Sequence, residues 1–222
     1  GGAVNADGGV AGGFENESTT ISRLAYEDGS GFWRAAVTYT LFESDFDAAA
    51  SDAPLFGLGL FDGELRTEQF VLSVQFDWSN WQLTGEYLIR NSDSLGINGF
   101  SEDQRLDLYI DGIGYYTKLC YAFTSNVKAY IRRDVVYLDK KDKAGLVLNA
   151  SSLLAGAPVP AHSAFAKDIT LGLIYEPSYE WSFGLELHRI NGTHWLPLQE
   201  NPITADHKQH WNMYLLQASY RF

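Results

Sequence analysis

Two side chains with catalytic potential, Glu186 and His188, are two residues apart in a segment of alternating character. In an extended strand, residues two apart point to the same face. A carboxylate beside an imidazole can act as a general base or as part of a weak metal site. The same two groups can also form a simple hydrogen-bonded pair on a strand surface, and we favour this second interpretation.

The other reactive groups form no recognisable catalytic set. His162, His194, His207 and His210 lie in or beside segments expected to be loops, and no Ser, His and Asp stand at positions suited to a hydrolase. His207 and His210 are three residues apart, a spacing that suits a metal only on a helix or turn. The single cysteine, Cys120, allows neither an internal disulfide nor a pair of thiolate ligands. We therefore expect no enzyme activity, no cofactor and no metal.

The elements that must position these groups are strands. In residues 81–90, Trp81, Leu83, Tyr87 and Ile89 fall on one face and mostly polar side chains fall on the other. Residues 69–78 alternate in the same way, and the two-residue link at 79–80 predicts a β-hairpin. Most such segments are longer than the roughly five or six residues typical of soluble strands.

The whole chain follows this pattern, so we expect an all-β protein whose 222 residues form one unit. Residues 1–18 are expected to form an external loop, and residues 19–222 about nine antiparallel strands. The nine expected strands are residues 19–26, 32–42, 69–78, 81–90, 113–123, 127–138, 167–176, 181–190 and the C-terminal strand 210–222.

The connections alternate in length, which is typical of transmembrane up-and-down β-barrels with short periplasmic turns and long external loops. Short turns are expected near residues 28, 79, 125 and 178, and long connections at 45–63, 91–107, 139–166 and 191–209. The connection at 140–165 either folds inward to narrow a pore or caps the barrel from outside.

Aromatic residues next to the short turns support the barrel. Trp33, Trp78, Trp81, Phe123 and Trp181 share the apolar face and predict the periplasmic aromatic girdle of such a protein. A soluble β-sandwich that binds ligands through its loops is an alternative, because its strands also alternate.

If the apolar face meets lipid, the opposite face lines a lumen with charges of both signs, which tune ion selectivity in a water-filled pore. Alternatively, these charged residues only hydrate the lumen and pair with each other across strands. The pore-lining residues expected on this basis are Arg34, Asp77, Glu86, Arg90, Lys118, Lys128, Arg132, Asp134, Asp168, Glu186, His188 and Arg221.

The chain ends Leu-Leu-Gln-Ala-Ser-Tyr-Arg-Phe. This ending resembles the terminal strand of Gram-negative outer-membrane barrels, and the resemblance implies that Tyr220 and Phe222 form the signal read by the barrel-assembly machinery. Residues of about 65–222, with Gly114-Tyr115-Tyr116, Tyr130-Ile131-Arg132-Arg133 and Leu171-Gly172-Leu173-Ile174-Tyr175, are similar in style to the back half of bacterial porins, the phosphate-selective group among them.

This resemblance implies a barrel of roughly sixteen strands that is often trimeric. Because only about nine strands are present, we expect a larger barrel whose front half lies outside this chain. The expected location is the bacterial outer membrane, and the expected partners are its lipids, the assembly machinery and small solutes or ions.

The formal charge of −12 argues against nucleic-acid binding, which needs clustered Lys and Arg. The leading hypothesis is a porin-like channel for passive diffusion of ions and small polar solutes, because the strands have one polar and one apolar face and no catalytic set is recognised. The alternative from the enzyme class is an outer-membrane barrel hydrolase that uses His188 or a loop histidine.

Overall fold

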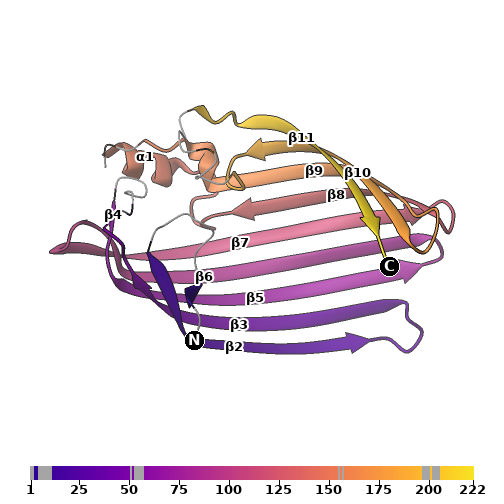
Figure 1. The fold of residues 1–222 in the computed structure, drawn as a ribbon, viewed down its shortest axis with the longest axis horizontal. Helices are drawn as coiled ribbons and strands as arrows, with labels where there is room; N and C mark the ends of the chain where they lie inside the picture. The colour runs from indigo at the N-terminus through magenta and orange to yellow at the C-terminus, as the bar shows by residue number, and fades with distance from the viewer. Residues whose placement is uncertain are drawn as a thin grey trace.

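Nine long antiparallel strands form one strongly curved sheet in the computed structural model (Figure 1). The structure describes residues 3–4, 12–50, 52, 58–154, 156, 158–196, 201 and 206–222. The long strands are β2 (Gly13–Glu27), β3 (Trp33–Asp47), β5 (Gly63–Trp78), β6 (Trp81–Ser101), β7 (Gln104–Ala122), β8 (Val127–Tyr137), β9 (Phe165–Tyr175), β10 (Trp181–Gly192) and β11 (His210–Tyr220).

Two short strands complete the sheet. β1 (Ala3–Val4) pairs with the start of β2, and β4 (Gly59–Leu60) pairs with the far end of β6. Every long strand pairs with its neighbour in the chain, so the order is that of an up-and-down sheet. Over the described residues the path of paired strands runs from β1 to β11 without closing on itself. The all-β, antiparallel up-and-down fold expected from the sequence is confirmed.

Short turns join the strands at one end of the sheet, on the right in Figure 1. Trp78 and Trp81 pair directly across the two-residue turn between β5 and β6. Ser79 in this turn has a φ of 52°, and positive φ values are typical of tight hairpin turns that match the twist of the strands. The predicted hairpin at residues 69–90 is therefore correct in register.

Aromatic rings contact each other beside these turns. The ring centroids of Trp81 and Tyr121 are 4.5 Å apart, and those of Tyr26 and Trp33 are 5.1 Å apart. Trp181 lies 4.9 Å from Tyr220 on the next strand. Cross-strand aromatic pairs of this kind stabilise a sheet and place a band of rings along its short-turn end.

The convex face of the sheet is covered with exposed apolar side chains. Leu24 is 78% exposed, Tyr214 70% and Leu216 85%. The exposed residues at alternate positions include Leu72, Tyr87, Tyr115, Ile131, Leu171, Leu173, Leu185 and Leu187. Because water-soluble proteins rarely expose so large a contiguous apolar surface, this face requires an apolar environment. A single sheet with one bare apolar face also differs from a β-sandwich, in which two sheets cover each other, so that alternative is wrong.

The structure corrects two predicted connections. β2 begins at Gly13, so residues 13–18 belong to a strand and not to the expected external loop. The predicted long connection at 91–107 is a continuous hairpin instead, in which Asn91 pairs with Asp111 and Ser101 with Gln104. The sequence of this hairpin is polar on both faces at many positions, so it lacks the alternation by which a half-buried strand is recognised.

Much of the buried core lies at the other end of the sheet, where a 3-10 helix packs against β9 and β10 and an α-helix packs against that 3-10 helix (Figure 1). The α-helix is α1 (Leu146–Leu154) and the 3-10 helix is η1 (Ala161–Ala164), and Asn149 of α1 donates from Nδ2 to the carbonyl of Val159, just before η1, over 2.7 Å. Val159, Ala164, Ala166 and Ile190 are buried there. Within the described residues, no helix is long and apolar enough to cross a membrane.

Candidate functional site

Charged and hydroxyl-bearing residues of neighbouring strands lie directly opposite one another on the concave face. One row crosses seven strands, and its register partners are Arg34, Gln75, Thr84, Lys118, Arg132, Thr170 and His188. The next row contains Asp134 opposite Asp168. Because register partners share a face and lie about 5 Å apart, polar side chains from distant parts of the sequence meet here.

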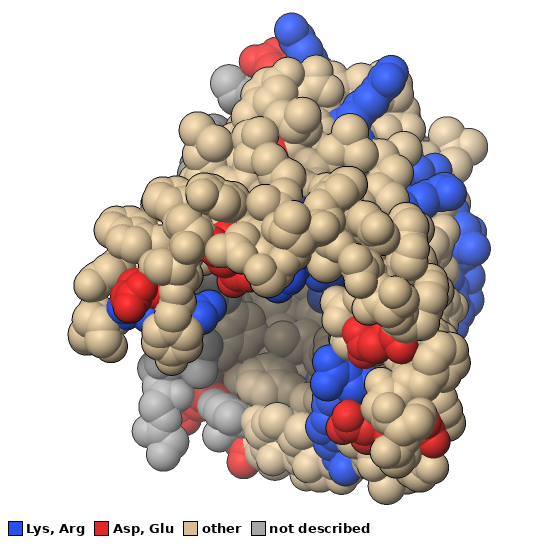
Figure 2. Space-filling view, turned by 90° about the vertical axis from the view of Figure 1, so that its right-hand side faces the viewer, with Lys and Arg blue, Asp and Glu red and all other residues tan. Residues whose placement is uncertain are grey.

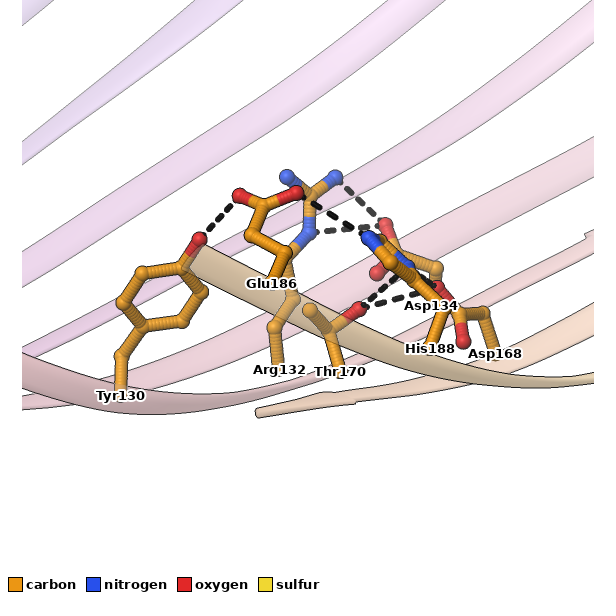
Figure 3. Close-up of polar contacts among 7 residues, drawn as sticks. All are labelled: Tyr130, Arg132, Asp134, Asp168, Thr170, Glu186 and His188. Atoms are coloured by element: carbon orange, nitrogen blue, oxygen red, sulfur yellow. Dashed lines mark hydrogen bonds and ion pairs between the residues drawn. The ribbon is translucent and has the colours of Figure 1, made fainter. Parts of the chain in front are cut away.

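His188 is the centre of the densest cluster, which is drawn in Figure 3. Its Nδ1 lies 2.6 Å from Oδ2 of Asp168, and its Nε2 lies 3.0 Å from Oε2 of Glu186. A carboxylate oxygen only accepts hydrogen bonds, so both ring nitrogens must donate. With both carboxyl groups ionised, this geometry is that of a doubly protonated, positively charged imidazole.

Thr170 completes the contacts on the Asp168 side. Its hydroxyl donates to Oδ2 of Asp168 over 2.9 Å and lies 3.1 Å from His188 Nδ1. The side chain of Asp168 is only 5% exposed. Its Oδ1 is buried and has no hydrogen-bond partner among the residues that the structure describes. A buried carboxylate oxygen without a donor is costly, so this atom is the least satisfied acceptor of the cluster.

Arg132 neutralises Asp134 on the adjoining strand. Its Nε lies 2.9 Å from Oδ1 of Asp134, and its Nη2 reaches the same oxygen. The guanidinium also lies over the ring of Tyr116, with Cζ 4.4 Å from the ring centroid. An ion pair and a cation–π contact together hold this guanidinium on the wall.

Tyr130 extends the network toward the short-turn end. Its hydroxyl donates to Oε1 of Glu186, although the two residues lie on β8 and β10 with β9 between them. Gly172 of β9 is the register partner of both. A Cβ at this glycine would collide with the Tyr130 ring, so the absence of a side chain lets the ring cross the intervening strand.

The cluster forms one wall of a cavity of about 330 Å³. The remaining lining residues are Ile190, Trp195, Trp211 and Met213, of which Met213 is the register partner of His188 and Trp211 that of Ile190. Trp211 is fixed by a 3.0 Å hydrogen bond from Nε1 to the Gly192 carbonyl, and Trp195 comes from the connection between β10 and β11. The cavity therefore lies near the end of the sheet that carries the long connections.

The arrangement does not suit general-base catalysis by His188. A catalytic histidine needs one nitrogen for an orienting carboxylate and the other for the proton of a nucleophile. Here both nitrogens face carboxylates. His162 contacts the Thr193 hydroxyl at 3.0 Å, but among the described residues no carboxylate is hydrogen-bonded to that ring. The described residues also include no group of three or more His, Cys, Asp or Glu side chains placed to hold a metal.

Comparison with known proteins gives one solved structure of similar fold. No protein-family model matches the chain, and no curated protein is similar to it in sequence. The outer-membrane channel DcaP of Acinetobacter baumannii superimposes with a TM-score of 0.58 at 13% sequence identity. The match covers 96% of this chain and 54% of the channel, so the chain spans about half the length of that protein.

The chain therefore shares its antiparallel up-and-down β-sheet fold with about half of that channel. This likeness confirms the porin-like fold expected from the sequence. It does not support the closer assignment to the phosphate-selective group, because no family model matches.

The structure brings together five of the twelve residues that alternation placed on the lumenal face: Arg132, Asp134, Asp168, Glu186 and His188. The other strand residues of that set lie elsewhere on the same face, each with a contact of its own. Arg34 donates to Gln75, Asp77 accepts from Gln75 and Gln82, and Glu86 accepts from the Ser73 hydroxyl. Lys118 lies over the Tyr130 ring, and Lys128 pairs with Glu176 at 3.1 Å.

The two remaining members of the set are placed differently. Arg90 has a buried Nε with no hydrogen-bond partner among the described residues. Arg221 follows the end of β11 and lies over the ring of Tyr179, in the turn between β9 and β10. Lys and Arg side chains are visible along the inside of the hollow that the curved sheet encloses (Figure 2).

Sequence reasoning missed Tyr130, Thr170, Trp195, Trp211 and Met213 as members of the site. Thr170 follows Asp168 by two residues, and this same-face spacing was a usable signal. Trp211 and Met213 are on the inward side of β11 by the same rule. Trp195 lies in a connection, where no periodicity predicts which way a side chain points.

Proposed function

We propose that this protein is an outer-membrane channel through which ions and small polar solutes diffuse passively. The observation that carries the proposal is the opposite chemistry of the two faces of one curved sheet: apolar and exposed outside, charged and hydrogen-bonded inside. A sheet of this kind suits a wall between lipid and water. The likeness in fold to an outer-membrane channel supports the same function.

In this proposal the residues of the concave face line the pore. They carry both signs of charge, so permeating ions meet fixed charges at close range. The net charge of −12 favours a mild preference for cations. Solutes of either sign would pass, because Arg34, Lys118 and Lys128 balance several of the carboxylates.

The proposal includes the bacterial outer membrane as the location and its lipids as the environment of the apolar face. Tyr220 and Phe222 are proposed as the signal for the barrel-assembly machinery. Both are exposed at the short-turn end, where a partner could reach them. Association into a homotrimer is part of the same proposal and is tested by the mass of the detergent-solubilised protein.

Single-channel recording in a planar bilayer tests the function. Stable conductance steps are expected, and a salt gradient should give a reversal potential whose sign corresponds to cation preference. Asp77→Asn removes one inner-face charge and should shift that potential toward anions. Glu180→Gln, in the exposed turn between β9 and β10, is the matched control and should leave the potential unchanged. Well-folded protein that never conducts would contradict the proposal.

A further inference from the structure

The charged cluster and the tryptophan side of the cavity together suggest a ligand of definite chemistry. We propose that the cavity between Asp168 and Trp211 binds a small organic monocation, an amine or guanidine that carries an apolar group. The inference rests on the proposed channel function only for the route by which a solute reaches the cavity. Binding itself can be measured without conductance.

The charge balance of the cavity favours a cation. Asp134, Asp168 and Glu186 contribute three carboxylates, and Arg132 and the doubly protonated His188 contribute two positive charges. One negative charge therefore remains in a partly enclosed place, where charges are weakly screened. A single positive charge on a ligand would neutralise it.

The cluster also contains an unsatisfied carboxylate oxygen. Oδ1 of Asp168 is buried and unpartnered, although Asp168 belongs to the cavity wall. An ammonium or guanidinium group brings hydrogen-bond donors and charge together, and a charge-assisted hydrogen bond is roughly twice as strong as a neutral one. A ligand cation beside Asp168 would stabilise the charge of this carboxylate, which lacks a donor at Oδ1.

The apolar wall selects an organic cation over a hydrated metal ion. Trp195, Trp211, Met213 and Ile190 offer aromatic and aliphatic surface beside the carboxylates. Indole rings attract cations through their faces and also pack against apolar groups. Cation–π contacts already occur on the same face of the sheet, where Arg132 lies over the ring of Tyr116 and Lys118 over that of Tyr130.

The size of the cavity limits the ligand. A volume of about 330 Å³ is at the lower end of the roughly 300–1,000 Å³ typical of small-molecule pockets. This space suits one ring with a short charged arm. An anionic solute is disfavoured, because Arg132 is held by Asp134 and Tyr116 and His188 by two carboxylates.

Titration calorimetry with the full chain in detergent tests the proposal, with phenethylammonium as the probe. We expect saturable binding of phenethylammonium and at least tenfold weaker binding of phenylacetate, which has a similar ring and the opposite charge. Ammonium chloride should bind much more weakly than phenethylammonium, because it lacks the ring. Equal binding of phenethylammonium and phenylacetate, or no binding of phenethylammonium, would overturn the proposal.

Two variants locate the site. Asp168→Asn keeps the size of the side chain and removes its charge, and Trp195→Leu removes a ring from the connection without touching the cluster. Each should weaken phenethylammonium binding at least fivefold. Asp103→Asn, at the exposed tip of the β6–β7 hairpin, removes the same charge elsewhere and should bind like the unmodified protein. Unchanged affinity in Trp195→Leu and in folded Asp168→Asn would place the ligand outside this cavity.

Conductance separates this inference from the channel proposal. Phenethylammonium binding by a protein that does not conduct would leave the site intact and refute only the channel. Conductance without binding of the amine would support the channel and refute the site. The charge comparison between phenethylammonium and phenylacetate uses the unmodified protein, so it remains decisive even if Asp168→Asn fails to fold.

Discussion

Nδ1 of His188 lies 2.6 Å from Oδ2 of Asp168, although the two residues are twenty positions apart in the sequence. They sit on neighbouring antiparallel strands, where Thr170 is the direct register partner of His188 and Asp168 is the diagonal neighbour. Glu186 holds the other ring nitrogen. The imidazolium is thus an internal counter-ion for two carboxylates on the concave wall.

Replacing His188 by Ala should destabilise the protein substantially. The change leaves the buried carboxylate of Asp168 without its cationic partner, and breaking a buried ion pair from one side typically costs about 3–5 kcal/mol. Urea-induced unfolding of protein inserted into lipid vesicles measures this loss. His210→Ala, at the exposed start of β11, is the control and should change the free energy of unfolding by less than about 0.5 kcal/mol. Equal effects of the two changes would argue against a structural role of the His188 pair.

Gly172→Ala should disturb Tyr130 in particular. The added Cβ collides with the Tyr130 ring, which crosses β9 at this point to reach Glu186. Forced repacking of this kind typically costs about 1–3 kcal/mol. A double-mutant cycle with Tyr130→Ala identifies the cause, because the cost of Gly172→Ala should largely disappear once the ring is absent. Additive costs would show that the glycine serves the backbone and not the tyrosine.

A positive charge on the convex face should oppose insertion into lipid. Leu185 and Leu216 are register partners on this face, and an arginine at the middle of a lipid-facing surface costs about 2–4 kcal/mol. Leu185→Arg should therefore lower the free energy of unfolding in vesicles by an amount in this range. Gln217→Arg, on the adjacent inward-facing position, should cost far less. If both variants are equally stable, the apolar face does not meet lipid.

Low pH should destabilise the connection between β10 and β11, where His194 lies. Burial lowers the pKa of His194 below its ordinary value, and the nearby Arg90 guanidinium acts in the same direction. Because the folded protein binds this proton less well than the unfolded chain, the stability contributed by neutral His194 is complete above about pH 6.5 and is lost as the pH falls through the folded-state pKa.

The unfolding temperature should accordingly fall between pH 7.5 and pH 5. His194→Gln should show a smaller fall, since its side chain cannot be protonated. Part of the pH dependence should persist in this variant, because the pKa of His162 is also lowered. The main cause is burial, and the charges of His207 and His210 add to it. A pH dependence unaffected by His194→Gln would assign the effect to other groups.

The amino-acid sequence was sufficient to predict the strand segments that are apolar on one face. Alternation of residues such as Leu83 and Thr84 is a local property, and it identifies a strand wherever one side meets an apolar phase and the other meets water. It failed at residues 91–101, where β6 continues beyond the alternating segment. Polar residues occupy both faces of the strand at many positions there, so no apolar period marks it.

The sequence by itself determined which face of each strand a residue occupies, because a side-chain period of two leaves only two choices. It placed Asp168 and His188 on one side of the sheet but gave no distance between them. Only the tertiary structure decided that distance, because the register between strands depends on turn geometry and on pairing along the whole length of the sheet. The same holds for Trp195 and Tyr130, whose contacts cross connections and intervening strands that no local pattern describes.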